Sequence, residues 1–214
     1  MTTAAAEHAH GHAPVPAEEA DPHFGAASTG KIAMWIFLIS DALSFSGLLL
    51  GYGILRGGTP GWPDPTRYLG INFTAGMTFL LICSSVTMVM AIAAAAEKNK
   101  AQTLLFLGLT ILGGALFLSG QAYEYTHLYH EKHMTLSGAG IADAPQFATT
   151  FFVITGFHGL HVLSGVVYLS VMFLGVVRGR HLGASSGGLE IAGLFWHFVD
   201  LVWILVFTFV YLIT

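Results

Sequence analysis

Two histidines three residues apart, His158 and His161, lie in the segment FFVITGFHGLHV, which is otherwise almost wholly apolar. Histidine can bind a metal or a haem through a ring nitrogen, and it can take up or release a proton near neutral pH. The apolar run around the pair continues to Val177, and a run of this length requires lipid around it. Ionisable groups at membrane depth are costly, so we expect both histidines to face protein or a water-filled cavity.

A second pair of polar residues follows in the segment GLFWHFVDLVW near the C-terminus. His197 and Asp200 are also three residues apart and therefore share one face of a helix. An acid beside a histidine fixes the tautomer and orientation of the ring, and pairing lowers the cost of placing both groups in lipid. We therefore expect His197 and Asp200 to be the partners of His158 and His161.

Two carboxylic acids extend this set. Asp41 lies ten residues after Lys31, which places it about 15 Å into a helix and so near the bilayer centre. Either it is a neutral carboxyl bonded to neighbouring helices, or it takes part in proton handling. Glu124 lies three residues after Gln121 at the end of another apolar run. Together with the histidines, these acids predict a buried polar network inside or beside a helical bundle.

A di-iron site is one alternative for these residues. Glu124-x-x-His127 has the local form of a di-iron carboxylate half-site, but such a site needs a second copy and more acids from other helices. The chain offers neither. His127, His130 and His133 form a row at intervals of three residues, and we interpret this row as part of a solvated loop that begins at Thr126.

A haem held by two histidines is the other alternative. His158 or His161 could face His197 across a pair of helices, but the repeated, depth-matched histidine pairs of such cytochromes are missing. The single cysteine, Cys83, cannot form a disulfide or a Cys-x-x-Cys pair within the chain. We therefore expect the chain to hold no catalytic centre, no metal and no redox cofactor.

The elements that must position these residues are membrane helices. Hydrophobic residues make up 54% of the chain and charged residues 9%, against about 25% charged residues in an ordinary soluble domain. Each apolar run exceeds the roughly 20 residues that a helix needs to cross a bilayer. The sequence thus predicts an all-α, polytopic membrane protein with one domain, residues 31–214. Its five transmembrane helices are expected at 31–55, 68–96, 101–125, 145–177 and 189–212.

Residues 1–30, rich in alanine, proline, glutamate and histidine, are expected to form a disordered tail without a signal peptide. His8, His10 and His12 within it could hold a metal, but incidental histidines in a flexible tail are the better interpretation. Five of the eight lysines and arginines fall on the side of the N-terminus. The positive-inside rule therefore favours a cytoplasmic N-terminus and a C-terminus on the periplasmic side.

The segments TTFFVITGFHGLHVLSG and GLEIAGLFWHFVDLVWILVF together resemble the signature of subunit III of haem-copper terminal oxidases. The resemblance extends back through SSVTMVM and QAYEY and covers nearly everything from Lys31 onward. It implies an all-helical membrane subunit without redox cofactors, packed against the catalytic subunit I beside subunit II. Haems and copper are then expected in those partner subunits, and structural phospholipids in a cleft between helix groups.

The resemblance also assigns individual residues. Asp41, in LISDALSFSG, falls where the family commonly has a buried glutamate. Arg178 and Arg180 lie on the basic side of the membrane and are the expected contacts of lipid head groups. The remaining members of the expected network fall on family motif positions as they stand: Glu124, His158, His161, Glu190, His197 and Asp200. Many family members have seven helices, whereas this chain resembles the five-helix bacterial forms.

From the resemblance we expect a non-catalytic subunit of a proton-pumping, aa3-type cytochrome c oxidase of aerobic respiration, located in the bacterial cytoplasmic (inner) membrane. It would stabilise subunit I, bind lipid and support proton uptake. Cytochrome c or quinol would reach the complex only through the partner subunits, and no nucleic-acid partner is expected. The alternatives are subunit III of a quinol oxidase, an accessory subunit of a nitric oxide reductase and, from a different class, a stand-alone haem b cytochrome.

Overall fold

The computed structural model describes residues 28–138, 144–183 and 186–213, and within these ranges the protein is all-helical. Five helical segments are long and apolar enough to cross a membrane, which confirms the predicted fold class. They comprise α1 (Thr29–Gly58), α3 (Ile71–Ala96), α4 (Lys100–Lys132), α5 (Pro145–Val177) and α6 (Gly187–Val206), the last continued by the π-helix η2 (Phe207–Leu212). A single-turn helix, α2 (Pro65–Tyr68), precedes α3. Residues 1–27 of the predicted tail, including His8, His10 and His12, lie outside the described residues.

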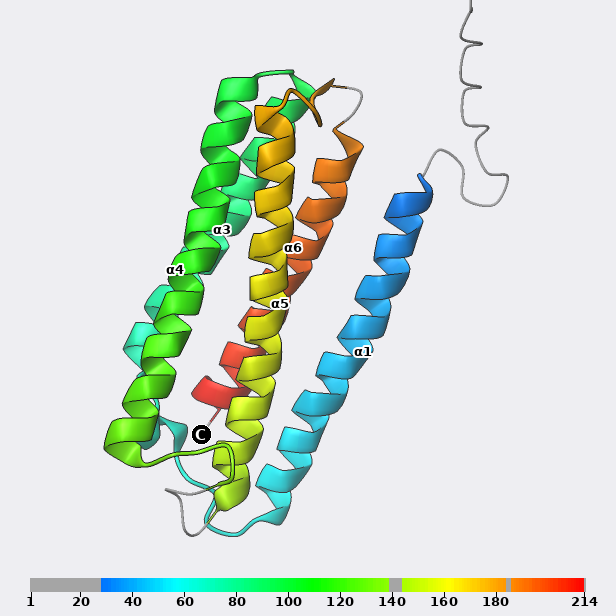
Figure 1. Cartoon of the computed structure of the whole chain (residues 1–214). Helices are drawn as coiled ribbons and strands as arrows, with labels where there is room; N and C mark the ends of the chain where they lie inside the picture. Colours follow the sequence, from blue (N-terminus) through cyan, green and yellow to red (C-terminus); the bar gives the residue numbers. More distant parts are fainter. Residues whose placement is uncertain (1–27, 139–143, 184–185, 214) are drawn as a thin grey trace, which may run out of the picture.

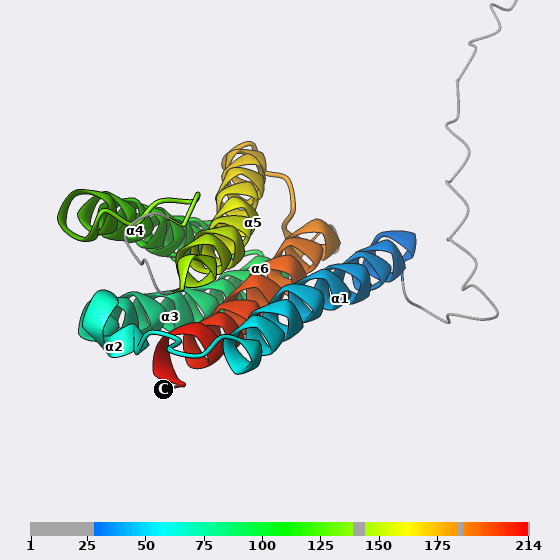
Figure 2. The ribbon, with the colours of Figure 1, turned by 90° about the horizontal axis from the view of Figure 1, so that it is seen from below.

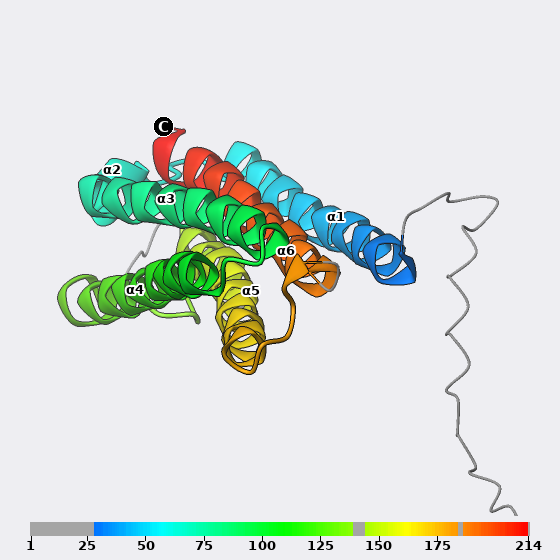
Figure 3. The same ribbon diagram turned by 90° about the horizontal axis from the view of Figure 1, so that it is seen from above.

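The helices pack as a bundle in which α1 lies at one edge (Figure 1). Seen along the bundle, α1 runs beside α6 on the side opposite to α4 (Figures 2 and 3). Its contacts with the bundle are mainly with α5 and α6. Only 11% of the residues in the apolar window of α1 are buried, compared with 56% in that of the span formed by α6 and η2. The outer face of α1 is therefore a large apolar surface.

Local sequence explains where the helices end. Ser28 caps α1 through its hydroxyl, and Pro145 occupies the first turn of α5, where its missing N–H is not needed. At the other end of α5, Gly179 adopts φ +79°. Its N–H bonds the Val176 carbonyl, and the N–H of Arg180 bonds the Gly175 carbonyl. This is a Schellman motif, and it fixes the exit of the chain at the basic end of α5.

Small residues allow close contact between the long helices. A side-chain carbon at Gly113 would lie 2.7 Å from Cβ of Ser84, one at Gly159 would lie 2.6 Å from Oε1 of Gln121, and one at Gly165 would lie 3.0 Å from the ring of Trp196. Helix association in lipid depends on such close packing, because the hydrophobic effect does not drive it there. Glycines in α4 and α5 thus hold α3, α4, α5 and α6 together.

The predicted start of the loop at Thr126 is wrong, because α4 continues almost two turns past Tyr125, to Lys132. Leu128 is buried and extends the inner face of the helix, and His127 and Glu131 pair across one turn at 3.6 Å. His127 and His130 therefore lie on a helix and not in a loop, and His133 forms its left-handed cap at φ 54°. All three are exposed, as expected of a solvated segment.

Candidate functional site

An aspartate and a histidine meet in the middle of the membrane span. Oδ1 of Asp41 on α1 lies 3.2 Å from Nε2 of His161 on α5. The Asp41 and His161 side chains are 9% and 15% exposed, respectively. Asp41 is the thirteenth of the thirty residues in α1, and His161 is the seventeenth of the thirty-three in α5, so the contact lies far from both helix ends.

The partner of the other ring nitrogen shows that Nδ1 of His161 carries a proton. Nδ1 of His161 lies 2.8 Å from the carbonyl oxygen of Phe157. A carbonyl oxygen can only accept, so Nδ1 carries a proton and donates it. The contact between Nε2 and Asp41 then needs one more proton, held either by the ring as an imidazolium or by the carboxyl as a neutral acid. The pair is neutral overall in both forms, which lowers its cost in lipid.

Two aromatic rings cover the Asp41–His161 pair on the side that faces the bundle. Phe45, one turn after Asp41, lies 5.2 Å from the ring of His161 and 4.9 Å from that of Phe157. Phe157 in turn lies 4.7 Å from His161. Rings at these distances exclude water and strengthen the electrostatic attraction between imidazole and carboxyl. Oδ2 of Asp41 is buried and has no hydrogen-bond partner among the described residues.

His158 does not join the predicted hydrogen-bond network. It is completely buried, and neither ring nitrogen has a hydrogen-bond partner within the described residues. Its ring lies 4.8 Å from that of Trp203 and 5.7 Å from that of Phe117, with Phe117 edge-on to it. His158 therefore faces the protein interior, as expected, but packs there as an aromatic ring. The expected bonds to α6 are absent from the described part of the chain.

His197 and Asp200 face α3 and not the histidines of α5. Oγ of Ser85 lies 2.6 Å from Nδ1 of His197, and the same hydroxyl also interacts with the carboxyl of Asp200. Next to them, the indole N–H of Trp196 donates to Oγ of Ser84 at 3.1 Å. The two serines thus join α3 to α6. The predicted partnership of His197 and Asp200 with His158 and His161 is wrong.

Glu124 forms a separate buried site near the other end of the bundle. It is 5% exposed, with Oε1 accepting from the Thr74 hydroxyl and Oε2 accepting from the Tyr211 hydroxyl, both at 3.1 Å. One turn earlier, Gln121 donates through Nε2 to the Thr155 carbonyl at 2.7 Å. Glu124 therefore links α4 to α3 and η2, and the predicted single network is in fact several small clusters.

Three of the residues predicted to be functional lie at the surface of the bundle, at the end where α5 terminates. Glu190 forms an ion pair with Lys31, and each side chain is 38% exposed, so Glu190 is not a buried member of any network. Arg178 and Arg180 are exposed at the same end of the bundle. Nearby, Nζ of Lys100 donates to the Val177 carbonyl at 2.7 Å.

Small polar residues of α3 are the partners that sequence reasoning missed. Thr74 bonds Glu124, Thr78 accepts from the indole N–H of Trp203 at 2.9 Å, and Ser85 bonds His197. These residues recur at near-helical spacing along one apolar helix, which is the signal that could have identified them.

No three residues among the described histidines, cysteines, aspartates and glutamates are close enough to hold a metal ion.

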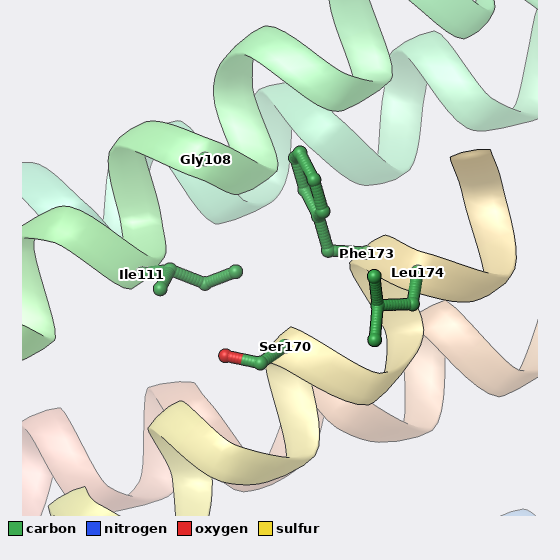
Figure 4. Close-up of a pocket in the computed structure, with 5 residues that line it drawn as sticks. All are labelled: Gly108, Ile111, Ser170, Phe173 and Leu174. Atoms are coloured by element: carbon green, nitrogen blue, oxygen red, sulfur yellow. The ribbon is translucent and has the colours of Figure 1, made fainter.

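An apolar groove lies between α4 and α5 at the basic end. Its volume is about 310 Å³, and Figure 4 shows side chains of the two helices facing one another across it. The residues around it are Gly108, Ile111, Ser170, Phe173 and Leu174. Leu174 is one turn from Arg178, so the groove begins about 6 Å from the exposed arginines along the helix axis.

Comparison with known proteins identifies the family. The family profile described as cytochrome c oxidase subunit III matches residues 65–214, more than half of the chain. The chain belongs to the cytochrome c oxidase subunit III family. Subunit 3 of the cytochrome c oxidase of Synechocystis sp. is 37% identical over 197 residues, which is 91% of this chain and 80% of that protein.

Two further relatives are third subunits of a quinol oxidase and of a cytochrome c oxidase. Subunit 3 of the cytochrome bo(3) ubiquinol oxidase of Pseudomonas putida is 33% identical, covering 85% of this chain and 84% of its own. Subunit 3 of the cytochrome c oxidase of Corynebacterium diphtheriae is 34% identical, covering 83% and 85%. The subunit III family thus includes relatives named for different electron donors. The chain is therefore a membrane-spanning subunit III of an oxidase complex.

Proposed function

We propose that the chain is the cofactor-free third subunit of an aa3-type oxygen reductase that oxidises cytochrome c. The names of the Synechocystis and Corynebacterium relatives support cytochrome c as the donor. The Pseudomonas relative supports quinol as the alternative. In this proposal the chain transfers no electrons, because haems and copper belong to partner subunits I and II.

Within the complex, the Asp41–His161 pair handles protons for uptake from the cytoplasmic side. The observation that carries this proposal is the 3.2 Å contact between Oδ1 of Asp41 and Nε2 of His161, which requires one proton between the two atoms. Moving that proton from nitrogen to oxygen changes no net charge, so the low-dielectric surroundings do not oppose it. Oδ2 of Asp41 is buried and has no partner among the described residues, so the pair would exchange a proton with water or with subunit I through this atom only when the side chain or α1 moves.

Arg178 and Arg180 hold lipid head groups at the cytoplasmic end. Their exposure, together with Lys100 at the same end, provides the positive charge that attracts anionic lipid. The groove between α4 and α5 would take an acyl chain below these head groups. The assignment of this end to the cytoplasm follows the positive-inside rule, with the N-terminus on the same side.

The test of the proton-handling role is the substitution Asp41→Asn in the assembled oxidase. An asparagine amide can still donate to Nε2 of a neutral His161, so the link between α1 and α5 persists while the titrating carboxyl is lost. We expect oxygen consumption to fall more steeply with rising pH than in the unmodified complex, and the enzyme to inactivate sooner during continuous turnover. Glu190→Gln is the matched control, because it weakens another attachment of α1 but leaves the pair intact.

An Asp41→Asn complex with an unaltered pH profile and lifetime would show that the pair is purely structural.

The identity of the electron donor is tested separately. Turnover of the purified complex with reduced cytochrome c, compared with turnover on a quinol alone, distinguishes the proposed donor from the alternative. Rapid turnover with quinol and none with cytochrome c would contradict the aa3 assignment.

A further inference from the structure

The end of the bundle where α1 begins carries a basic surface. Two connections form it, residues 97–100 between α3 and α4 and residues 178–183 after α5. Lysines of the first connection reach across to the second. Lys98 lies over Gly183, and Lys100 donates to the last turn of α5. The two connections therefore lie against each other and form one continuous surface.

Positive charge dominates this basic surface. The two connections contain four lysines and arginines and a single acid. These residues are Lys98, Lys100, Arg178, Arg180 and Glu97. All five are exposed, and none of them forms an ion pair with a described residue. An excess of exposed charge of one sign attracts a partner of the opposite sign.

The N-terminal tail of the same chain carries the opposite charge. Residues 1–27 contain four acids and no lysine or arginine. Glu18, Glu19 and Asp21 lie within four residues of one another, close to the start of α1. The tail therefore begins at the end of the bundle that carries the basic surface, and the two are complementary in charge.

The acids at 18–21 are near enough in the chain to reach the basic surface. Gly30, in the first turn of α1, packs against Ile191 of α6, and Gly188 at the start of α6 packs against His181 of the second connection. The start of α6 thus lies between the start of α1 and the end of α5 (Figures 1 and 3). Packed helices lie about 8–10 Å apart, so two such steps span about 20 Å. Asp21 lies seven residues before the first described residue, and seven extended residues span about 23 Å.

We propose that residues 18–21 dock on the basic surface, with their carboxylates on Lys98 and its basic neighbours. A single exposed ion pair contributes little to stability, but three acids on a short tether act together at a high effective concentration. Docking would tie the start of α1 across α6 to the connections beyond it. Among the described spans, α1 has the smallest buried share, so it gains most from a further attachment. The inference does not rest on the proposed role of Asp41 and His161.

The experiment is cross-linking of the purified oxidase complex in detergent. A water-soluble carbodiimide joins a carboxylate to an amine only where the two are in contact. We expect mass spectrometry to find an acid of residues 18–21 joined to Lys98 or Lys100, and less of this product as the salt concentration rises. The link between Lys31 and Glu190 is the internal positive control, because these two side chains form an ion pair.

Lys132 is the internal negative control, because it is exposed at the opposite end of the bundle. Tail acids joined to Lys98 no more often than to Lys132 would overturn the proposal. So would the absence of these links while the positive control forms. Anionic lipid is the competing occupant of the basic surface. We expect the links to persist in phosphatidylglycerol nanodiscs, and their loss there but not in phosphatidylcholine nanodiscs would assign the surface to lipid and overturn the proposal.

A variant without the three acids gives a second readout. In the triple variant Glu18→Gln, Glu19→Gln, Asp21→Asn, the tail keeps its length but loses the charges that would cover Lys98. We expect an acetylating reagent to modify Lys98 several-fold faster, relative to Lys132, than in the unmodified complex. Glu7→Gln is the matched control, because it removes an acid of the same tail outside residues 18–21. An unchanged rate in the triple variant, or an equal rise in the control, would overturn the proposal.

Discussion

Nε2 of His161 lies 3.2 Å from Oδ1 of Asp41, and this contact joins the middle of α5 to the middle of α1. Because α1 buries little of its surface, each polar contact matters for its attachment. Two further contacts hold its ends, one between Lys31 and Glu190 and one between Arg56 and the Ile213 carbonyl. The central contact is the only one of these three that buries an ionisable pair.

Removal of one member of this pair should cost more stability than removal of both. Asp41→Leu or His161→Leu alone leaves a buried polar group unpaired, with an expected loss of about 3 kcal/mol. In the double variant both groups are apolar, so most of that loss should be recovered. The measurement is denaturant unfolding of the subunit in detergent micelles, analysed as a double-mutant cycle. Strictly additive losses would mean that the two side chains do not interact.

Tyr211→Phe tests the Glu124 cluster. Without the hydroxyl, Oε2 of Glu124 loses its donor while remaining buried, so we expect a loss of about 1–3 kcal/mol in the free energy of unfolding. Tyr129→Phe is the control, because Tyr129 is 58% exposed and its loss should stay within about 0.5 kcal/mol. Equal effects of the two substitutions would argue against a stabilising bond between Tyr211 and Glu124.

Two glycine substitutions should act in opposite directions. Gly159→Ala places a carbon 2.6 Å from Oε1 of Gln121, so the buried Gln121 amide must move and disturb its bond to the Thr155 carbonyl, at an expected cost of about 1–3 kcal/mol. Gly47→Ala meets no atom within 4 Å on its helix and should be neutral or stabilising by up to about 1 kcal/mol. Thermal unfolding of both variants in the same detergent measures the difference. Destabilisation by Gly47→Ala would instead point to a contact with a partner subunit or lipid at that position.

The stability of the N-terminal cap that Asp64 provides for α2 should depend on pH. Asp64 accepts hydrogen bonds from the hydroxyl and the backbone N–H of Thr66, at 2.8 and 2.9 Å, and these bonds lower the pKa of its carboxyl. A lowered folded-state pKa means that the stabilisation is fully present above the ordinary carboxyl range and is lost as the pH falls through the folded value. The protection of the Thr66 amide from hydrogen exchange, measured relative to the intrinsic exchange rate at each pH, should therefore fall at low pH. In Asp64→Asn the amide oxygen still caps the helix, and this fall in protection should vanish.

Much of the fold follows directly from the sequence, because each helix that spans the membrane must be a long apolar run. The five spans were predictable for this reason, and so was the burial of His158. The end of α4 was not, because His127, His130 and Lys132 are polar yet remain helical outside the apolar layer. Apolar length measures the thickness of the lipid, whereas a helix ends where its capping and packing end.

The partners of the polar residues were harder to predict. Spacing of three residues puts His158 and His161 on one face, but their side chains still diverge by about 60° around the axis. That difference sends His158 toward Trp203 and His161 toward Asp41 on α1. The rotation of each helix relative to its neighbours decides such pairings, and it depends on packing across the whole bundle. The position of Asp41 within an apolar run was enough to single it out, but its partner could not be named from the sequence.

The position of α1 has a consequence for biogenesis. During synthesis Asp41 enters the bilayer long before His161 is made, because 120 residues separate them in the chain. Since α1 packs mainly on α5 and α6, its docking surface does not exist until the last helices have been inserted. Until then its acid is best tolerated by the membrane in the protonated form. Of the described membrane spans, the one translated first is therefore the last that can dock on its partners in the bundle.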